Sequence, residues 1–408
     1  MSPPTNEQRV IYQVSMYSSL VANKKGPDLE AQLYAAIQAA LVKDAPQIGH
    51  WSVAWGPVVV QHEPESYAIN AMYVAECQDH HLRGTYVVGI AGTNPASLFD
   101  WLVEDGLVQK QVPWVYALRS APGARIALGT GIGLSILQHA QPGGDRPGAG
   151  TTLLKFLGGI EPKLGKRLIV SGHSLGGALS PTLTLWLHDV RILWDTFHLV
   201  QLSTMPTAGP TAGNSIFAAY SDKHLTATRF ANDIDVVPHA WQASDLEKIP
   251  TLYAPDIEPD KVINDLVAFA QRLSASGDYT QILHDTGWFP GKVEKTIIDP
   301  SKSVFYNFVK QLAFQHTIAY LEFFGVLSDI LHEWAEEFQA AAEAAAPAVA
   351  AGFAARSAAQ EATAPASDAL AAQVVADLLR YATPEQQQIA VPVDPQSLVD
   401  ARSGAPSQ

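Results

Sequence analysis

The hexapeptide GHSLGG at residues 172–177 restricts the possible folds of this chain more than any other sequence feature. It stands between KRLIVSG, an apolar run typical of a buried strand, and GGALSPTLTLWLHDV, a run typical of a helix. A strand that turns directly into a helix strains the corner residue, here Ser174, and exposes its hydroxyl above the sheet. The small residues Gly172 and Gly176 let the two backbones pass closely. The pattern therefore predicts a strand–turn–helix unit with Ser174 as a nucleophile.

A serine nucleophile needs a general base, and that base needs an acid to orient it. In proteins with this turn, the acid and the histidine follow the serine in that order. The segment RFANDIDVVPHA offers Asp233 and Asp235 as acids after a strand-like run. Spacing alone does not choose the base among the downstream histidines, which are His188, His198, His224, His239, His284, His316 and His332.

Short apolar runs alternate with helical stretches along most of the chain. Strands are expected over 51–60, 67–77, 84–92, 166–172, 196–204 and 224–233. Helices are expected over 28–42, with Asp28 as the cap, over 176–190, from about 212, and once or twice within 303–327. Residues 1–26 look polar and irregular. The alternation predicts an α/β protein with a mostly parallel central sheet and helices on both faces.

The composition permits a large core and argues against a nucleic-acid partner. Hydrophobic residues make up 47% of the 408 residues and charged residues 16%, enough for one large domain or two ordinary ones. The formal charge is −14, from 40 acidic and 26 basic residues, and no basic stripe interrupts it. Phosphate binding needs clustered Lys and Arg, so neither nucleic acid nor simple electrostatic docking to anionic lipid is expected.

Cys77 is the single cysteine, which excludes a disulfide within the chain. Its place in the strand-like run INAMYVAEC predicts a buried thiol. The start, MSPPTNEQRV, has neither a basic region nor a following apolar stretch, so no signal peptide is expected. No segment reaches the roughly 18 consecutive apolar residues of a membrane-spanning helix. A soluble intracellular protein is the default expectation, and the oligomeric state stays open.

Five separate stretches together resemble the class 3 (fungal-lipase-like) family of α/β-hydrolases, over about residues 50–325. They are VVGIAGTNPASLFDW at 87–101, GHSLGG, PTAGN at 210–214, and NDIDVVPH at 232–239 followed by QHTIAYL at 315–321. These resemble, in order, the family's oxyanion strand and loop, its nucleophile motif, its PRVGN segment, and its acid and histidine segments. The resemblance implies an α/β-hydrolase fold and hydrolysis of lipid esters without a metal or organic cofactor.

The resemblance also implies roles for single residues. It places the catalytic acid at Asp235 rather than Asp233, and the base at His316. It makes Thr93 and the backbone N–H of Leu175 the oxyanion donors. One departure is Ala91, which stands where the family usually has Arg, and this affects the local scaffold more than the chemistry.

The segment 95–114 occupies the position of the family's lid. It combines acidic residues with apolar ones, among which Leu98, Phe99, Trp101 and Leu102 are the expected lid and substrate contacts. A lid of this kind would cover the site in water and turn its apolar face to an oil–water interface. The alternative is a buried helix that does not move.

The composition changes after about Glu336, where Ala becomes dominant. This change divides the chain into a catalytic domain, 1–335, and an Ala-rich, partly helical extension with a flexible tail, 336–408. Within the extension, 368–382 is expected to be helical, since Leu370, Val374, Val375 and Leu378 fall on one face.

The interpretation is therefore a serine hydrolase of lipid carboxylic esters, such as a triacylglycerol lipase. Phospholipase A1, short-chain esterase and thioesterase activities are alternatives, and a catalytically silent hydrolase-fold scaffold is the alternative of another class. Neither GTGIGLS at 129–135 nor the pair His80 and His81 is interpreted as a site. The first lacks the rest of a dinucleotide-binding unit, and the second is more typical of a solvated loop.

Overall fold

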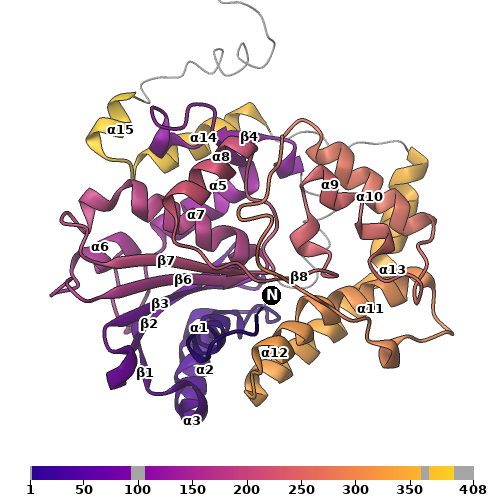
Figure 1. Cartoon of the computed structure of the whole chain (residues 1–408), viewed down its shortest axis with the longest axis horizontal. Helices are drawn as coiled ribbons and strands as arrows, with labels where there is room; N and C mark the ends of the chain where they lie inside the picture. Colours follow the sequence, from indigo (N-terminus) through magenta and orange to yellow (C-terminus); the bar gives the residue numbers. More distant parts are fainter. Residues whose placement is uncertain (1, 93–105, 360–366, 390–408) are drawn as a thin grey trace, which may run out of the picture.

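The central sheet has the strand order β1-β2-β3-β6-β7 (Figure 1). The computed structural model describes residues 2–92, 106–359 and 367–389. The strands are β1 (Trp51–Gln61), β2 (Ala68–Cys77), β3 (Thr85–Ile90), β6 (Arg167–His173) and β7 (Gln201–Thr207). The pairs β1–β2 and β2–β3 are antiparallel, whereas β3–β6 and β6–β7 are parallel. Parallel bridges from β7 to Ala227 and Phe230 continue the parallel half of the sheet.

Each central strand buries both of its faces, which divides the core in two. Along β6, Ile169 belongs to one apolar cluster, while its neighbours Leu168 and Val170 belong to the other. In β3, Val87 and Val88 divide in the same way. Successive side chains of a strand point to opposite faces, so an unbroken apolar run needs a covering layer on both sides.

Helices provide these layers (Figure 1). The helices α1 (Asn6–Met16) and α2 (Leu29–Lys43) pack on one face. On the other face, α7 (Leu175–Asp189) packs on β6 and β7, and α5 (Leu128–His139) packs on α7 and β2. This confirms the predicted α/β architecture with a mostly parallel sheet and helices on both faces.

The remaining elements surround this layered centre. The small strands are β4 (Gln111–Pro113), β5 (Arg125–Ala127), β8 (Ala231–Asn232) and β9 (Trp288–Phe289). The further helices are α3 (Ala45–Ile48), α6 (Leu153–Gly158), α8 (Ser215–His224), α9 (Ala243–Leu246), α10 (Lys261–Ser274), α11 (Val304–His316), α12 (Ile318–Phe324) and α15 (Pro384–Ile389). The run 303–327 thus forms two helices, within the expectation of one or two. The single thiol, Cys77, is buried as expected.

The N-terminal segment differs from the expectation, because residues 6–16 form a helix rather than irregular chain. The signal is a capping box: Thr5 Oγ1 accepts from the Gln8 backbone N–H, and the Gln8 side chain accepts from the Thr5 N–H. The second half of α1 is fully buried against the sheet. The buried half of α1 includes the polar residues Gln13 and Ser15, so its sequence does not show a continuous apolar stripe. Both side chains can be buried because they form hydrogen bonds inside the protein.

Three further details also correct the sequence interpretation. The expected strand 196–204 begins later, at Gln201, because residues 191–193 form a 3₁₀ turn and 194–200 a loop. The expected strand 224–233 is reduced to two isolated bridges and the two-residue β8. Asp28 occupies the N-cap position of α2, as expected. Its backbone lies in the left-handed region with φ 60°, and its side chain makes no capping hydrogen bond.

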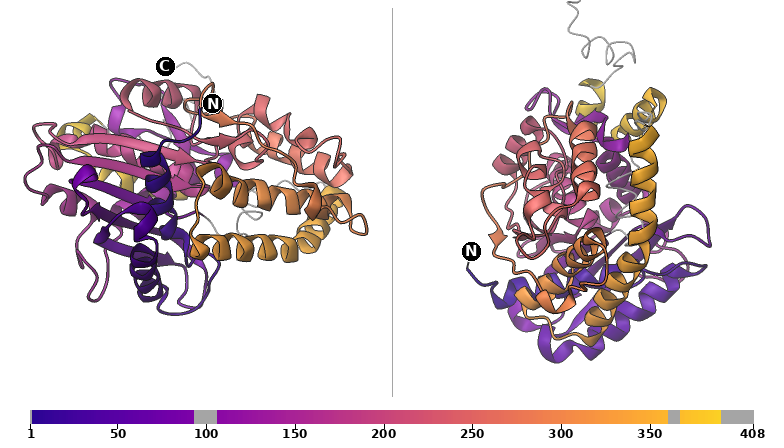
Figure 2. Two further views of the ribbon diagram at one scale, coloured as in Figure 1. Left: turned by 60° about the horizontal axis from the view of Figure 1, so that its bottom comes forward. Right: turned by 90° about the vertical axis from the view of Figure 1, so that its right-hand side faces the viewer.

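Helices of the described C-terminal part pack on the rest of the molecule. The long α13 (Asp329–Ala359) runs beside α11, as both views in Figure 2 show. Its Phe338, Ala342 and Ala346 are buried in the same cluster as α1 and α11. α14 (Asp368–Leu379) packs on α5, where it buries Val374 and Leu378, while Leu370 is exposed. Among the described residues, no helix combines the length and apolarity that a membrane crossing requires.

Candidate active site

Ser174 lies at the sharp corner between β6 and α7. Its backbone has φ 60° and ψ −125°, a strained conformation for a residue with a side chain. Glycines make the corner possible, since a Cβ on Gly172 would overlap the Gly176 backbone, and one on Gly176 would overlap the Ile90 carbonyl. The structure thus forms the strand–turn–helix unit that GHSLGG predicts.

The segment expected to supply the oxyanion donors begins directly beside Ser174. Strand β3 pairs with β6 up to Ile90 and Gly172, and Gly92 follows two residues later. A Cβ on Gly92 would lie 3.1 Å from the Ser174 Cβ, so the two backbones are in close contact. Leu175, the other expected donor, is the first residue of α7, where backbone N–H groups have no acceptor within the helix. Thr93 lies outside the described residues.

The Asp235 carboxylate is completely buried and receives three hydrogen bonds. Its Oδ2 accepts from His316 Nδ1 at 2.8 Å and from the Tyr320 hydroxyl at 3.0 Å. Its Oδ1 accepts from the Val237 backbone N–H at 3.1 Å. Donors on both oxygens hold the carboxylate in one orientation.

His316 is also completely buried, at the last position of α11. Because a carboxylate only accepts, Nδ1 of His316 must have the proton that it shares with Asp235. In the neutral ring Nε2 is then the basic nitrogen, and within the described part of the chain it is buried without a hydrogen-bond partner. This is the protonation pattern that a general base for a serine requires.

Hydrogen bonds also join the segments that contain the acid and the base. Tyr320 accepts from the Asn232 backbone N–H at 2.9 Å while it donates to Asp235. The Asn232 amide donates to the carbonyl and side chain of Gln315, the residue before His316. Burial raises the pKa of Tyr320 well above its usual value, and the neighbouring Asp235 raises it further, so the hydroxyl stays a donor. The pattern of residue types gave no sign of the role of Asn232.

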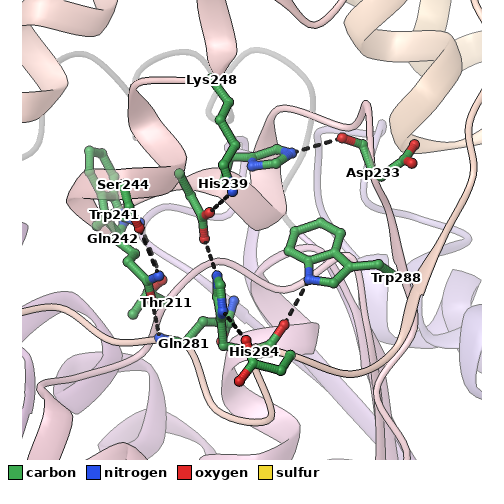
Figure 3. Close-up of polar contacts among 12 residues, drawn as sticks. Thr211, Asp233, His239, Trp241, Gln242, Ser244, Lys248, Gln281, His284 and Trp288 are labelled. Atoms are coloured by element: carbon green, nitrogen blue, oxygen red, sulfur yellow. Dashed lines mark hydrogen bonds and ion pairs between the residues drawn. The ribbon is translucent and has the colours of Figure 1, made fainter.

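Asp233, the other candidate acid, is exposed. Its Oδ1 accepts from the Gly291 N–H at 2.7 Å, and its carbonyl accepts from His239 Nε2 at 3.0 Å (Figure 3). His239 is stacked on Trp288, whose indole N–H donates to the His284 carbonyl at 2.7 Å. These contacts support the loop that contains Asp235 from its outer side.

The other sequence candidates are not part of this arrangement. His284 contacts Asp245, His188 contacts Asp189, and His332 contacts the Val326 carbonyl. Within the described part of the chain, His316 is the histidine that hydrogen-bonds to Asp235. The expected lid contacts Leu98, Phe99, Trp101 and Leu102 lie outside the described residues. Among the residues that are described, no group of three or more His, Cys, Asp or Glu side chains could hold a metal ion.

Comparison with known proteins identifies the family. A family model described as lipase (class 3) matches residues 155–244, which include the nucleophile corner and the Asp235 loop. The crystal structure of M37 lipase matches with a TM-score of 0.70 and 32% identity, over 81% of this chain and 96% of that chain. The chain belongs to the class 3 lipase family. As a member of this family it has the α/β-hydrolase fold and is a hydrolase of lipid carboxylic esters.

More distant lipases match over a smaller part of the chain. Lipase II from Rhizopus niveus is 15% identical, with a TM-score of 0.41, over 60% of this chain and 78% of that chain. A triacylglycerol lipase described as having a serine protease triad is 17% identical, with a TM-score of 0.41, over 60% and 78% of the two chains. No curated protein matches this chain.

Proposed function

We propose that this class 3 lipase hydrolyses acylglycerol esters, triacylglycerols in particular, through the triad Ser174, His316 and Asp235. The observation that supports the triad best is the buried His316. Its Nδ1 bonds to Asp235 at 2.8 Å, and its Nε2 is buried and has no hydrogen-bond partner among the described residues. A buried polar atom without a partner is costly, and such atoms in native proteins are often functional.

In the first step, Nε2 of His316 removes the hydroxyl proton of Ser174 as Oγ attacks the ester carbonyl carbon. Asp235 stabilises the imidazolium that forms and stays ionised. The carbonyl oxygen becomes an oxyanion, which the N–H groups of Leu175 and Thr93 receive. The positive end of the α7 dipole favours the same negative charge. His316 then protonates the departing alcohol oxygen, which leaves an acyl-enzyme.

In the second step, His316 removes a proton from water, which attacks the acyl carbon. The tetrahedral intermediate collapses, Ser174 Oγ takes the proton back, and the fatty acid leaves. Each step transfers one proton through His316 and requires no cofactor. Each oxyanion donor contributes about 3 kcal/mol to lowering the barrier, because it is aimed at charge that exists only in the tetrahedral state.

The test is hydrolysis of p-nitrophenyl esters from acetyl to palmitoyl, with wild type and Ser174→Ala compared. We expect activity in wild type and a loss of about 10⁶-fold in the variant, because residues of a triad act as a unit. Labelling of Ser174 by a fluorophosphonate probe gives an independent measure of the nucleophile. Equal activity of the two proteins would refute the proposed triad.

The chain-length profile distinguishes the alternatives within the enzyme class. A lipase prefers long acyl chains, and release of fatty acid from trioctanoin and from phosphatidylcholine then separates it from a phospholipase A1. A preference for acetyl or butyryl esters would indicate a short-chain esterase or thioesterase. Folded protein that neither hydrolyses any ester nor reacts with the probe would favour the scaffold alternative.

The segment 95–114 is proposed as the lid. The acidic residues and the apolar set Leu98, Phe99, Trp101 and Leu102 would then separate onto its outer and inner faces. We expect the rate on an ester such as tributyrin to rise abruptly at the solubility limit of the substrate. A rate that increases smoothly through this limit would contradict lid opening at an interface.

A further inference from the structure

The backbone carbonyl of His316 makes an unusual hydrogen bond. His316 is the last residue of α11. The final carbonyls of a helix accept no hydrogen bond from a backbone N–H of the same helix. The His316 carbonyl lies 2.6 Å from Nε2 of His173, a residue 143 positions earlier in the chain. His173 immediately precedes Ser174, so one hydrogen bond connects the residue before the nucleophile to the backbone of the base.

His173 is itself held firmly in place. It ends β6, pairs with Thr207 of β7, and its side chain is 2% exposed. Its Nδ1 lies 3.1 Å from Thr207 Oγ1, and the same hydroxyl lies at 3.2 Å from the Gly172 carbonyl. The rings of Tyr12 and Tyr320 meet the His173 ring edge-on, with centroids 6.5 and 5.0 Å away. The imidazole therefore has little freedom to turn.

The contact with the His316 carbonyl defines which nitrogen of His173 is protonated, and burial defines the charge of the ring. A carbonyl only accepts, so Nε2 must have a proton and donate it to the His316 carbonyl. Burial lowers the pKa of His173 well below its usual value, and the nearby His316 lowers it further. The two rings are 4.7 Å apart, so two positive charges there would repel each other. His173 is therefore neutral, which leaves the single positive charge of the catalytic cycle to His316.

We propose that His173 is a positioning residue, which holds the backbone of His316 beside the end of β6, next to Ser174, through the hydrogen bond from its Nε2 to the His316 carbonyl. The inference rests on the proposed function, because it assigns His316 as the base. Asp235 orients the His316 ring through Nδ1, while His173 fixes the backbone from which the ring extends. A base displaced by about 1 Å can cost about 100-fold in rate, so this backbone contact affects catalysis without touching substrate.

The test compares His173→Phe with His173→Gln on one soluble p-nitrophenyl ester. Phe keeps a flat ring in the pocket but has no donor, and we expect kcat to fall about 10- to 100-fold with KM within about twofold. Gln has an amide N–H near the position of Nε2, and we expect it to restore kcat to within about threefold of wild type. The separation of kcat from KM and the rescue by Gln distinguish positioning from a merely structural role.

Ser171→Ala is the matched control. Ser171 lies on the same strand two residues earlier, is completely buried, and donates to the Met205 carbonyl at 2.9 Å without contacting His316. We expect it to lower the melting temperature but not kcat. Wild-type kcat in His173→Phe, or a Gln variant no better than Phe, would overturn the proposal. Ser174→Ala in the same assay shows separately whether the proposed nucleophile is correct.

A measurement on the wild-type protein keeps the proposal testable if His173→Phe does not fold. Nuclear magnetic resonance of protein with ¹⁵N-labelled histidine would report the protonation of each ring. We expect His173 to show a persistent Nε2–H signal and no titration between pH 5 and 8. A His173 ring that becomes protonated in this range would overturn the assignment as a neutral donor, whatever the outcome of the activity assays.

Discussion

Two aspartates two positions apart, Asp233 and Asp235, illustrate how burial separates residues of the same type. Both follow the same strand-like run, and the local residue pattern does not show which of them is the catalytic acid. Asp235 turns inward and receives His316, Tyr320 and the Val237 N–H. Asp233 is exposed, and its Oδ1 accepts from the Gly291 backbone N–H. The role of each aspartate therefore depends on the residues that it contacts in the folded protein.

This difference predicts unequal effects of the same substitution. Asp235→Asn keeps the shape but removes the charge that stabilises the imidazolium and selects the Nδ1–H tautomer, so kcat should fall about 10⁴-fold. Asp233→Asn should change kcat less than about threefold, since Asn still accepts from Gly291. Steady-state kinetics of both variants on one ester measures this. Comparable losses in the two variants would show that the acid is assigned to the wrong residue.

The neutral, buried His173 predicts a pH dependence of stability. In the unfolded chain a histidine binds a proton below pH ~6.5, whereas the folded His173 has a depressed pKa and does not. The unfolded state therefore binds more protons below this pH, and stability is lost as the pH falls, by up to ~1.4 kcal/mol per pH unit for one proton. Melting temperatures of wild type should drop more steeply between pH 7 and 5 than those of His173→Gln. Parallel slopes would contradict a depressed pKa.

At the scale of elements, the nucleophile corner depends on three backbones that meet without side chains between them. The end of β3, the end of β6 and the first turn of α7 approach so closely that Gly176 contacts the Ile90 carbonyl directly. The strain at Ser174 persists because both flanking elements are buried and cannot relax. The geometry of the nucleophile is thus a property of the packed strand–helix unit.

The matched pair Gly176→Ala and Gly158→Ala tests this dependence. A Cβ at Gly176 would overlap a backbone carbonyl, so we expect a loss of several kcal/mol or insoluble protein. A Cβ at Gly158, the last residue of α6, meets nothing within 4 Å, and the better helix propensity of Ala should leave stability unchanged or slightly higher. Melting temperatures measure the contrast. A Gly176→Ala protein as stable as wild type would show that the backbones can separate.

At the scale of the whole molecule, the Ala-rich C-terminal part contributes to the core that surrounds the site. α13 begins at Asp329 and continues without a break through Glu336, and its Phe338 ring lies 6.1 Å from that of His316. The division at 335/336 remains a proposal about domains, and these contacts predict that the two parts depend on each other.

Truncation after Glu336 tests this dependence. Loss of Phe338 alone should cost about 3–5 kcal/mol, and the truncation also exposes the apolar faces of α11 and α5 that α13 and α14 cover. We therefore expect aggregated or inactive protein. Removal of residues 390–408 retains every described helix and serves as the control, with wild-type melting expected. A soluble 1–336 fragment with full activity would establish an independent catalytic domain.

The sequence alone determined the features that depend on local pattern. The GHSLGG corner between an apolar strand and a helix predicted the position of Ser174, because such a turn needs glycines at fixed offsets. The alternation of strands and helices predicted the two-sided α/β sheet. The sequence also contained the capping box of α1, although a helix with polar residues on its buried half does not show a clear apolar stripe.

Only the tertiary structure decided which distant polar groups meet. Seven downstream histidines were equivalent by spacing, and His316 is distinguished by hydrogen bonds to Asp235, 81 positions earlier, and to His173, 143 positions earlier. Such contacts depend on where the tertiary structure places the last residue of α11, beside His173 and Asp235. Local pattern says nothing about that placement. Burial also depends on the whole fold, because a side chain is shielded from water only when several helices and strands pack around it. The protonation of His173 and Tyr320 therefore follows from the fold and not from the residues themselves.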